Sequence, residues 1–327
     1  MNDNVPKALQ EAITYFADYA NAHAFWAGVR WPSGQVCCPT CGSVRVRYIQ
    51  TRRQRECRER HPKRRFSLKT QTIMEDSPLP LEKWTAALWV EVNCKNSISS
   101  WEVHRDLGVT QKTAWFMLHR IRHALHVGSF DKRLCGAVEV DETFVGGRSE
   151  FMHKSKRRVK ITGGGPKDKT AVVGLLERHS GNKHSTVRAT VFKGYPNKDS
   201  LHEIIHRNVQ GGSELYTDTH GGYVGLGAYY AHRFVDHAEA YVKDKVVHTN
   251  GLENFWSLFK RCIKGTHVAI APCHLFRYVD SEAYRFNNRK LDDRGRFIGA
   301  AGSIVGKRLM YKELINTSWE GYTSAGN

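Results

Sequence analysis

Three acidic residues could together do metal-dependent chemistry: Asp141, Asp218 and Glu253. Asp141 lies in the alternating apolar and polar run of residues 137–144, which predicts a strand, and Asp218 ends a second strand-like run just before a turn. Glu253 lies near the start of an apparent helix over residues 250–261. If the fold brings the three carboxylates together, their oxygens would bind hard divalent cations, Mg²⁺ or Mn²⁺. Such a site could hold two ions for phosphoryl transfer.

The first two ligands each have a competing interpretation. On an extended strand, Asp141 shares a face with Glu139 while Glu142 faces the other way, so we take Asp141 as the ligand. A slip of one residue in register would substitute Glu142. Asp218 precedes a Gly-Gly turn, and its side chain could cap that turn instead of binding metal.

The third ligand is open between two residues. Asn250 lies three residues before Glu253, and we favour Glu253 because a charged oxygen binds Mg²⁺ more strongly. Lys260 follows Glu253 by about two helical turns, so both project from one face and Lys260 could reach a DNA phosphate. His248 and His237 could assist, although an isolated histidine more often makes structural hydrogen bonds.

The charge of the chain indicates a polyanionic partner. The chain has 50 Lys and Arg against 32 Asp and Glu, a formal net charge of +18 and a pI near 9.6. A field of this sign attracts nucleic acid. The excess is concentrated in residues 45–69, with 11 basic side chains, and in residues 154–169, with seven. Clusters of this kind track phosphates, and double-stranded DNA is the predicted partner.

Four residues have the spacing of a zinc site. Two residues separate Cys38 from Cys41, and after 15 intervening residues three residues separate Cys57 from His61. Two such pairs joined by a short hairpin supply the tetrahedral ligands of one structural Zn²⁺. Cys37 could replace one ligand, although the role of a spectator thiol fits it better. The zinc-stapled ribbon would either carry a basic face suited to DNA or be a structural knuckle with a solvated surface.

Residues 97–115 have the rhythm of a helix-turn-helix motif. Gly108 would occupy the tight turn, and Thr110 would cap the second helix. Gln111 and Lys112 would then lie at the exposed amino end of that helix, where base edges are read. Plain packing of two helices is the alternative, because many such pairs contact no DNA. The candidate DNA-binding residues are Arg45, Arg47, Arg52, Arg53, Gln111, Lys112, Lys154, Lys156, Arg157 and Arg158.

The order of elements predicts a mixed α/β catalytic domain after two small modules. Strand and helix patterns alternate from residue 137 to the helix that carries Glu253, in which Phe255 and Trp256 have the spacing of core residues. A Gly- and Lys-rich insertion interrupts them, and it either holds DNA over the site or forms a solvated loop. The predicted domains are an N-terminal helical segment (1–35), a zinc ribbon (36–76), a helix-turn-helix module (77–130), the catalytic domain (136–292, with the insertion at 146–170) and a C-terminal tail (293–327).

The sequence predicts a cytoplasmic, nucleoid-associated protein. No apolar run reaches the ~20 residues that span a bilayer, and the first residues lack the basic and then apolar plan of a signal peptide. In that compartment the eight cysteines are expected to be reduced thiols or metal ligands rather than disulfides.

Several of these motifs together resemble the zinc-ribbon-bearing DDE transposases of bacterial insertion sequences, which are relatives of the eukaryotic Merlin elements. The resemblance extends from the first helix to about residue 289 and lies in the segments Cys38–Cys41, Val138–Thr143, Tyr216–Asp218, His248–Trp256 and Arg285–Arg289. It implies a ribonuclease-H-like catalytic fold, Mg²⁺ dependence, and cutting and joining of element ends. It also implies a homodimer or larger assembly, since two ends must be joined together.

Two functions of other classes compete with transposition. A zinc-dependent regulator with a helix-turn-helix motif would bind DNA without chemistry, so replacing Asp141 would leave its DNA transactions unchanged. A ribonuclease-H-like nuclease would cleave DNA without joining it. The chemistry expected of a transposase is hydrolysis that frees a 3′-OH, which then attacks target DNA in line, with no covalent enzyme intermediate.

Overall fold

The computed structural model describes residues 5–126, 132–147, 153–160, 169–179, 184–192, 194–235 and 248–316. These residues form two compact units, the first within Met1–Val127 and Asn288–Asn316 and the second within Gly128–Asn287. In the part of the chain so described, no helix combines the length and the apolar character that crossing a membrane requires.

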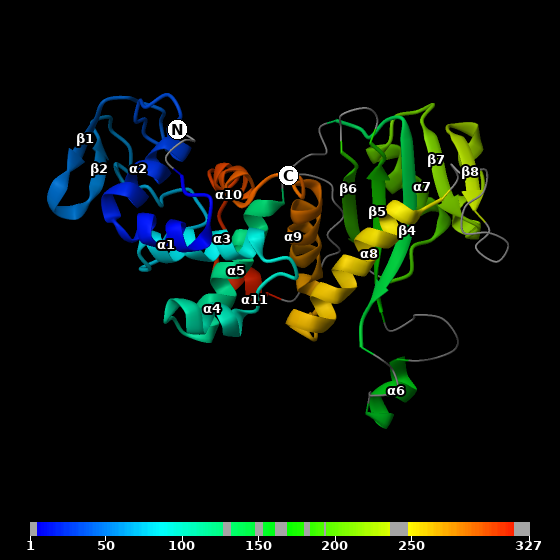
Figure 1. The fold of residues 1–327 in the computed structure, drawn as a ribbon. Coiled ribbons are helices and arrows are strands. Elements are labelled where there is room, and N and C mark those ends of the chain that lie inside the picture. Colours follow the sequence, from blue (N-terminus) through cyan, green and yellow to red (C-terminus); the bar gives the residue numbers. More distant parts are fainter. Residues whose placement is uncertain are drawn as a thin grey trace. The chain divides into compact units, whose positions relative to one another are not determined.

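The first unit is mainly helical (Figure 1). Its helices are α1 (Leu9–Ala17), α2 (Tyr19–Arg30), α3 (Leu81–Asn93), α4 (Ser100–Leu107), α5 (Gln111–Leu125), α10 (Asp293–Gly302) and α11 (Tyr311–Ile315). The N-terminal segment that the sequence predicts as one helical stretch divides at Asp18. The Asp18 carboxylate accepts hydrogen bonds from the backbone N–H groups of Ala20 and Asn21 and so caps α2.

The C-terminal segment differs from the expected tail, because α10 is part of the core of the first unit. Phe297 of α10 is fully buried, and its ring stacks on Phe25 with centroids 5.2 Å apart. The same ring lies 5.0 Å from Trp89 of α3 and 5.8 Å from Phe16 of α1. Phe297 is the one large aromatic residue of α10, so the segment lacks the repeated apolar spacing that would have predicted a packed helix.

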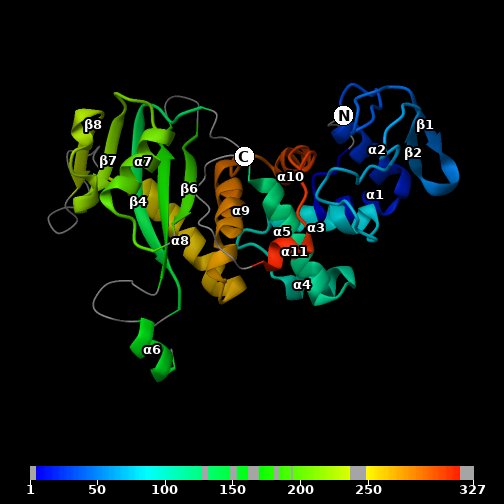
Figure 2. The same cartoon turned by 180° about the vertical axis from the view of Figure 1, so that it is seen from behind.

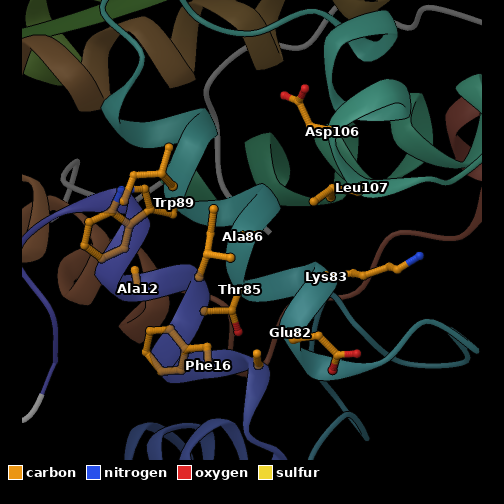
Figure 3. A pocket seen from close by; sticks show the side chains of 12 residues that line it. Ala12, Phe16, Glu82, Lys83, Thr85, Ala86, Trp89, Asp106 and Leu107 are labelled. Carbon is orange, nitrogen blue, oxygen red and sulfur yellow. The ribbon is translucent and has the colours of Figure 1, made fainter.

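A cavity of about 230 Å³ lies among α1, α3 and α4. Figure 3 shows the rings of Phe16 and Trp89 on one side of it, and the charged side chains of Glu82, Lys83 and Asp106 on the other. Most of the lining is apolar.

The first unit also carries a small antiparallel sheet. Its strands are β1 (Val46–Ile49), β2 (Gln54–Cys57) and β3 (Arg65–Phe66). The β1–β2 hairpin turns through Arg53, whose backbone is left-handed with φ of 49°. The hairpin brings Cys57 back beside the segment that contains Cys38 and Cys41.

The second unit is built on a five-stranded mixed sheet, so the predicted α/β fold class is confirmed. The strands are β4 (Ala137–Val145), β5 (Thr170–Glu177), β6 (Thr186–Phe192), β7 (Glu214–Asp218) and β8 (Ala231–Val235). Their order is β6-β5-β4-β7-β8, in which β5 is antiparallel to its neighbours β4 and β6, and β7 is parallel to its neighbours β4 and β8. This is the strand arrangement of a ribonuclease-H-like domain.

Helices cover both faces of this sheet. They are α7 (Lys198–Asn208), α8 (Asn250–Cys262) and α9 (Leu275–Asn287), and a π-helical turn (Ile263–His267) follows α8. Figure 1 and Figure 2 show α8 and α7 on opposite faces. Leu252, Phe255 and Phe259 of α8 are fully buried in one core with β5 and β6, whereas Leu201 and Ile205 of α7 enter the other core.

The expected insertion is partly helical. Residues 154–160 form α6 (Lys154–Lys160) between β4 and β5. Most of its residues are basic, so the segment has no apolar stripe from which a helix could be predicted.

Candidate active site

Asp141 and Asp218 lie on neighbouring parallel strands at corresponding positions. The last registered pair between β4 and β7 joins Glu139 to Tyr216, and each aspartate lies two residues further along its own strand. Neighbouring strands are roughly 4.8 Å apart, so this register places the two aspartates side by side on adjacent strands. The structure thus brings together two acids that are 77 positions apart in the sequence.

The electrostatics of Asp141 link it to both other acids. Burial raises the pKa of Asp141 to about 6, and the negative charges of Asp218 and then Glu253 act in the same direction. Like charges gathered around a half-buried carboxylate destabilise one another unless a cation lies among them. A divalent cation would remove this repulsion, and oxygen donors of this kind suit Mg²⁺ or Mn²⁺.

The spacing of the three acids differs from that of a compact cage for one ion. Among the described residues, the zinc-ribbon set is the one group of three or more Asp, Glu, His or Cys whose ligand atoms all lie within 4.8 Å of one another. The two ions of a two-metal site are about 3.5–4 Å apart, so carboxylates that bind different ions of the pair can lie more than 4.8 Å from each other.

Trp256 of α8 contacts Asp141, which the sequence did not predict. Its indole N–H donates to Oδ2 of Asp141 over 2.9 Å, and this hydrogen bond opposes the rise in the pKa of Asp141. The ring is also buried in the core, as its spacing predicts. Gly174 of β5 allows this packing, because a Cβ there would come within 2.6 Å of the Trp256 ring.

Two further acids were the subject of competing interpretations: Glu142, the alternative to Asp141, and Asp218, which could cap a turn. Burial, opposed by the Tyr223 hydroxyl and supported by the charges of Asp218 and Asp141, raises the pKa of Glu142 to about 7. Within the described residues, its Oε1 has no hydrogen bond of ordinary geometry. Oδ1 of Asp218 accepts from the backbone N–H of His220 over 2.9 Å and so caps the turn that follows. One Asp218 oxygen therefore shapes the turn, while the charge of the carboxylate acts on Asp141.

Helix α8 presents its candidate residues on an exposed face. Glu253, Lys260 and Asn250 are all exposed, and Glu253 and Lys260 are seven residues apart on one side of the helix. Of the two candidates for the third ligand, Glu253 is the one whose charge acts on Asp141. Asn250 carries no charge, so this interaction does not compare the positions of the two residues, and the choice of Glu253 over Asn250 stays a prediction.

His248 makes structural hydrogen bonds before α8. Arg178 donates to its Nδ1 over 3.0 Å and also to its backbone oxygen. Burial, and then the positive charge of Arg178, lowers the pKa of His248. His237 lies outside the described residues.

The four predicted zinc ligands form one cluster. Cys38, Cys41, Cys57 and His61 each offer an atom, and all four atoms lie within 4.8 Å of one another. The Sγ atom of Cys38 is 3.5 Å from Nε2 of His61, and those of Cys41 and Cys57 are 3.6 Å apart. Ligands about 2.3 Å from a tetrahedral Zn²⁺ are separated by roughly 3.8 Å, so the set fits zinc. Cys37 is not a member of the cluster.

The basic residues of the ribbon are partly neutralised by local acids. Arg45 pairs with Glu59 at 3.3 Å, and Arg47 pairs with Glu56 at 2.5 Å. The Arg53 guanidinium lies 4.1 Å from the centre of the Tyr19 ring. The guanidinium groups of Arg45 and Arg47 remain mostly exposed, with 67% and 60% of the side-chain surface accessible, so a phosphate could still reach them.

The helix pair α4–α5 has the predicted turn but a restricted exposed face. Gly108 is left-handed with φ of 56°, and the Thr110 side chain accepts from the backbone N–H of Thr113. The Gln111 amide donates to Ser100, and the Lys112 ammonium lies 4.8 Å from the ring centre of Tyr311 in α11. Beyond its first turns α5 is mainly buried, so the exposed part of this helix is its amino end.

Helix α6 carries the remaining candidate DNA contacts. Lys154, Arg157 and Arg158 are exposed on it. The side chain of Lys156 lies outside the described residues.

Two family models match the chain at the two sites just described. The model of the ISXO2-like transposase domain matches residues 133–287, which include the whole five-stranded sheet, α8 and α9. The model of the transposase zinc-ribbon domain matches residues 18–59, which include three of the four clustered ligands. The chain therefore combines a transposase zinc-ribbon domain with an ISXO2-like transposase domain.

The chain is also similar to individual proteins. The chain is 26% identical over 276 residues to an uncharacterized protein in transposable element ISH50 of Halobacterium salinarum, covering 82% of this chain and 90% of that protein. It is 13% identical to a chain in the cryo-electron microscopy structure of the simian T-cell lymphotropic virus intasome with PP2A regulatory subunit B56 gamma. That likeness covers 55% of this chain and 67% of the other, and its TM-score of 0.27 is too low to carry an argument.

Proposed function

We propose that this DNA transposase hydrolyses a phosphodiester bond at each element end to free a 3′-OH, and that it then joins this 3′-OH to target DNA. The observation that carries the proposal is the electrostatic action of Asp218 and Glu253 on Asp141, from β7, α8 and β4. Carboxylates from these three elements supply the oxygen donors that phosphoryl transfer with two metal ions requires.

The protein would act by positioning and by neutralising charge. When bound, two divalent cations supply activation of the entering oxygen and stabilisation of the leaving oxygen. Asp141, Asp218 and Glu253 would hold them, with Mg²⁺ as the expected ion, and the Trp256 indole would keep the Asp141 carboxylate oriented. Lys260, exposed on the same helical face as Glu253, would bind a DNA phosphate beside the site.

The rest of the chain would bind the duplex. The exposed guanidinium groups of Arg45 and Arg47 on the ribbon and of Arg157 and Arg158 on α6 would contact phosphates. Lys112 at the amino end of α5 would approach the bases or the backbone. Joining of two ends would take at least two copies of the chain on DNA.

A strand-transfer assay tests the proposal. Labelled element ends with free 3′-OH groups and a plasmid target are incubated with the protein and Mg²⁺. Asp141→Asn, Asp218→Asn and Glu253→Gln should each lower joining by roughly a thousandfold, since metal ligands contribute several kcal/mol to the transition state. Glu203→Gln is the matched control, because Glu203 is an exposed carboxylate of α7 with 61% of its side chain accessible.

The outcomes separate the competing functions. Cleavage without joining would identify a nuclease. Intact joining in all three acid variants would refute the proposed site, and DNA binding with no metal-dependent reaction in the unmodified chain would identify a regulator.

A further inference from the structure

The amino end of α8 is not capped by its own flanking residue. Within the described residues, Thr249 at the N-cap position makes no side-chain hydrogen bond to the helix. A helix start leaves several backbone N–H groups without intrahelical partners, and a buried start needs other acceptors. This end matters because it carries Glu253 in the first turn of the helix.

Glu139, a distant residue of β4, supplies the missing acceptor. Its Oε2 accepts from the backbone N–H of Leu252 over 2.9 Å, across 113 positions of sequence. Only 1% of the Glu139 surface is accessible. A carboxylate is a strong acceptor for such an N–H group and is also favoured by the positive end of the helix dipole.

The contact between strand and helix is close enough to require glycine. A Cβ on Gly251 would lie 2.8 Å from Oε2 and 3.1 Å from Oε1 of Glu139. The next neighbour of that Cβ would be Cδ2 of Leu176, at 3.1 Å. Because Gly251 has no side chain, the first turn of α8 can pack directly against the Glu139 carboxylate.

Arg178, the residue that follows β5, completes the arrangement. It donates from Nε to Oε1 of Glu139 over 2.8 Å and from its other end to the backbone oxygen of His248. Its guanidinium also lies 4.2 Å from the ring centre of Tyr216 on β7. One ion pair therefore holds the helix start both through the Leu252 N–H group and through the chain segment that precedes the helix.

Glu139 and Asp141 lie on the same face of β4, two residues apart. The strand thus contributes one carboxylate to the active site and another that fixes the helix bearing Glu253. We propose that Glu139, braced by Arg178, is a positioning residue that sets Glu253 opposite Asp141 and so determines the metal affinity of the site. This inference rests on the proposed metal-dependent function.

The test is a calorimetric titration of the full, zinc-loaded chain with Mn²⁺. In Glu139→Gln an NH₂ group replaces one of the two carboxylate oxygens. The side chain then has one acceptor oxygen left, so it can no longer accept at both ends, from Leu252 and from Arg178. We expect the Mn²⁺ dissociation constant to rise about 10- to 100-fold, the range known for partners of metal ligands. In the strand-transfer assay, joining should recover part of its rate at high Mn²⁺, and KM for DNA should stay unchanged.

Two comparisons separate positioning from general stability. Glu177→Gln is the matched control, because Glu177 also accepts from a backbone N–H group on this sheet, that of Cys135 at 2.9 Å. It should leave Mn²⁺ affinity unchanged. If Glu139→Gln fails to fold, Arg178→Lys, which keeps the charge but loses the fork of donors, takes its place.

A double-mutant cycle examines the contact itself. Gly251→Ala should weaken Mn²⁺ binding strongly in the unmodified chain, and clearly less when Glu139→Ala has removed the atoms that the new Cβ meets. Additive effects would overturn the inference, and so would a wild-type Mn²⁺ affinity in Glu139→Gln while Asp141→Asn loses binding. If Asp141→Asn also kept wild-type affinity, the proposed function itself would fail.

Discussion

At the scale of single residues, the candidate active site gathers negative charge around the buried carboxylate of Asp141. Burial and the nearby Asp218 and Glu253 raise the pKa of Asp141 to about 6, and Glu142 has a pKa of about 7. Sites arranged for function commonly reduce stability in this way. The stability of the metal-free protein should therefore respond to pH through these groups.

The first prediction concerns Asp141→Asn in the zinc-loaded chain, without added Mg²⁺ or Mn²⁺. The folded-state pKa of Asp141 is raised to about 6 from its ordinary value of 3.8, so the folded state binds this proton more tightly and loses stability as pH rises from about 4 to about 6. Asn does not titrate, and its amide oxygen can still accept from Trp256. We expect the variant to unfold at a higher temperature than the unmodified protein at pH 7 and at a similar one at pH 4.

Thermal unfolding followed by circular dichroism measures this difference. Glu203→Asn is the control, because this exposed carboxylate lies away from the acids of the site. A stability advantage of Asp141→Asn that shrinks as pH rises would contradict the assignment.

Single residues could be predicted from sequence only where their roles are local. The alternation of β4 correctly separates Asp141 from Glu142, because side-chain direction in a strand follows from position alone. The Trp256 hydrogen bond to Asp141 spans 115 positions, and the Arg178 ion pair with Glu139 spans 39. Nothing in the sequence around these residues encodes such partners, since only the tertiary fold brings them together.

At the scale of elements, the catalytic unit depends on close approach of α8 to the sheet. Gly174 of β5 lies under the Trp256 ring, and Gly251 lies over Glu139. Both glycines have ordinary backbone conformations, so their role is to leave space rather than to permit an unusual turn.

We predict that Gly174→Ala lowers the free energy of unfolding by about 1–3 kcal/mol, the usual cost of overpacking a core. The added methyl would meet the Trp256 ring at 2.6 Å and Leu252 at 2.9 Å. It would also displace the indole N–H from Asp141, so joining activity should fall. Denaturant unfolding measures the first effect, and Gly211→Ala is the control because a Cβ at Gly211 meets nothing within 4 Å.

The bounds of β4 and α8 were predictable within one residue, whereas α6 and α10 were not predictable. In the strands, runs of β-branched residues end at turn residues, and in α8 apolar side chains recur at helical spacing. Helix α6 consists mainly of Lys and Arg, and α10 contributes Phe297 as its single large aromatic anchor. Whether a segment without an apolar stripe forms a helix depends on its tertiary contacts, which cannot be read from the sequence.

At the scale of the whole molecule, the two units have different sources of stability. The ribbon of the first unit has short strands and a zinc cluster, whereas the second unit has two apolar cores around its sheet. A small metal-stapled module gains much of its folding free energy from the metal. Loss of zinc should therefore affect the first unit selectively.

The corresponding prediction is that Cys38→Ser abolishes the zinc content, from one ion per chain to none, and exposes residues around the ribbon to proteases. Atomic absorption measures the metal, and limited proteolysis with mass spectrometry locates the cleavage sites. The second unit should remain resistant, and Cys94→Ser, a change outside the cluster, should retain the zinc. Equal loss of protection in both units would contradict this view.

The first unit is discontinuous, because residues 288–316 complete a core that residues 5–126 begin. A ribosome therefore releases Phe16, Phe25 and Trp89 long before it adds Phe297, the ring against which all three pack. A nascent or prematurely terminated polypeptide therefore exposes these aromatic side chains to chaperones and proteases. Quality control would thus discard incomplete copies. The first unit would complete its fold only after the second unit has been translated.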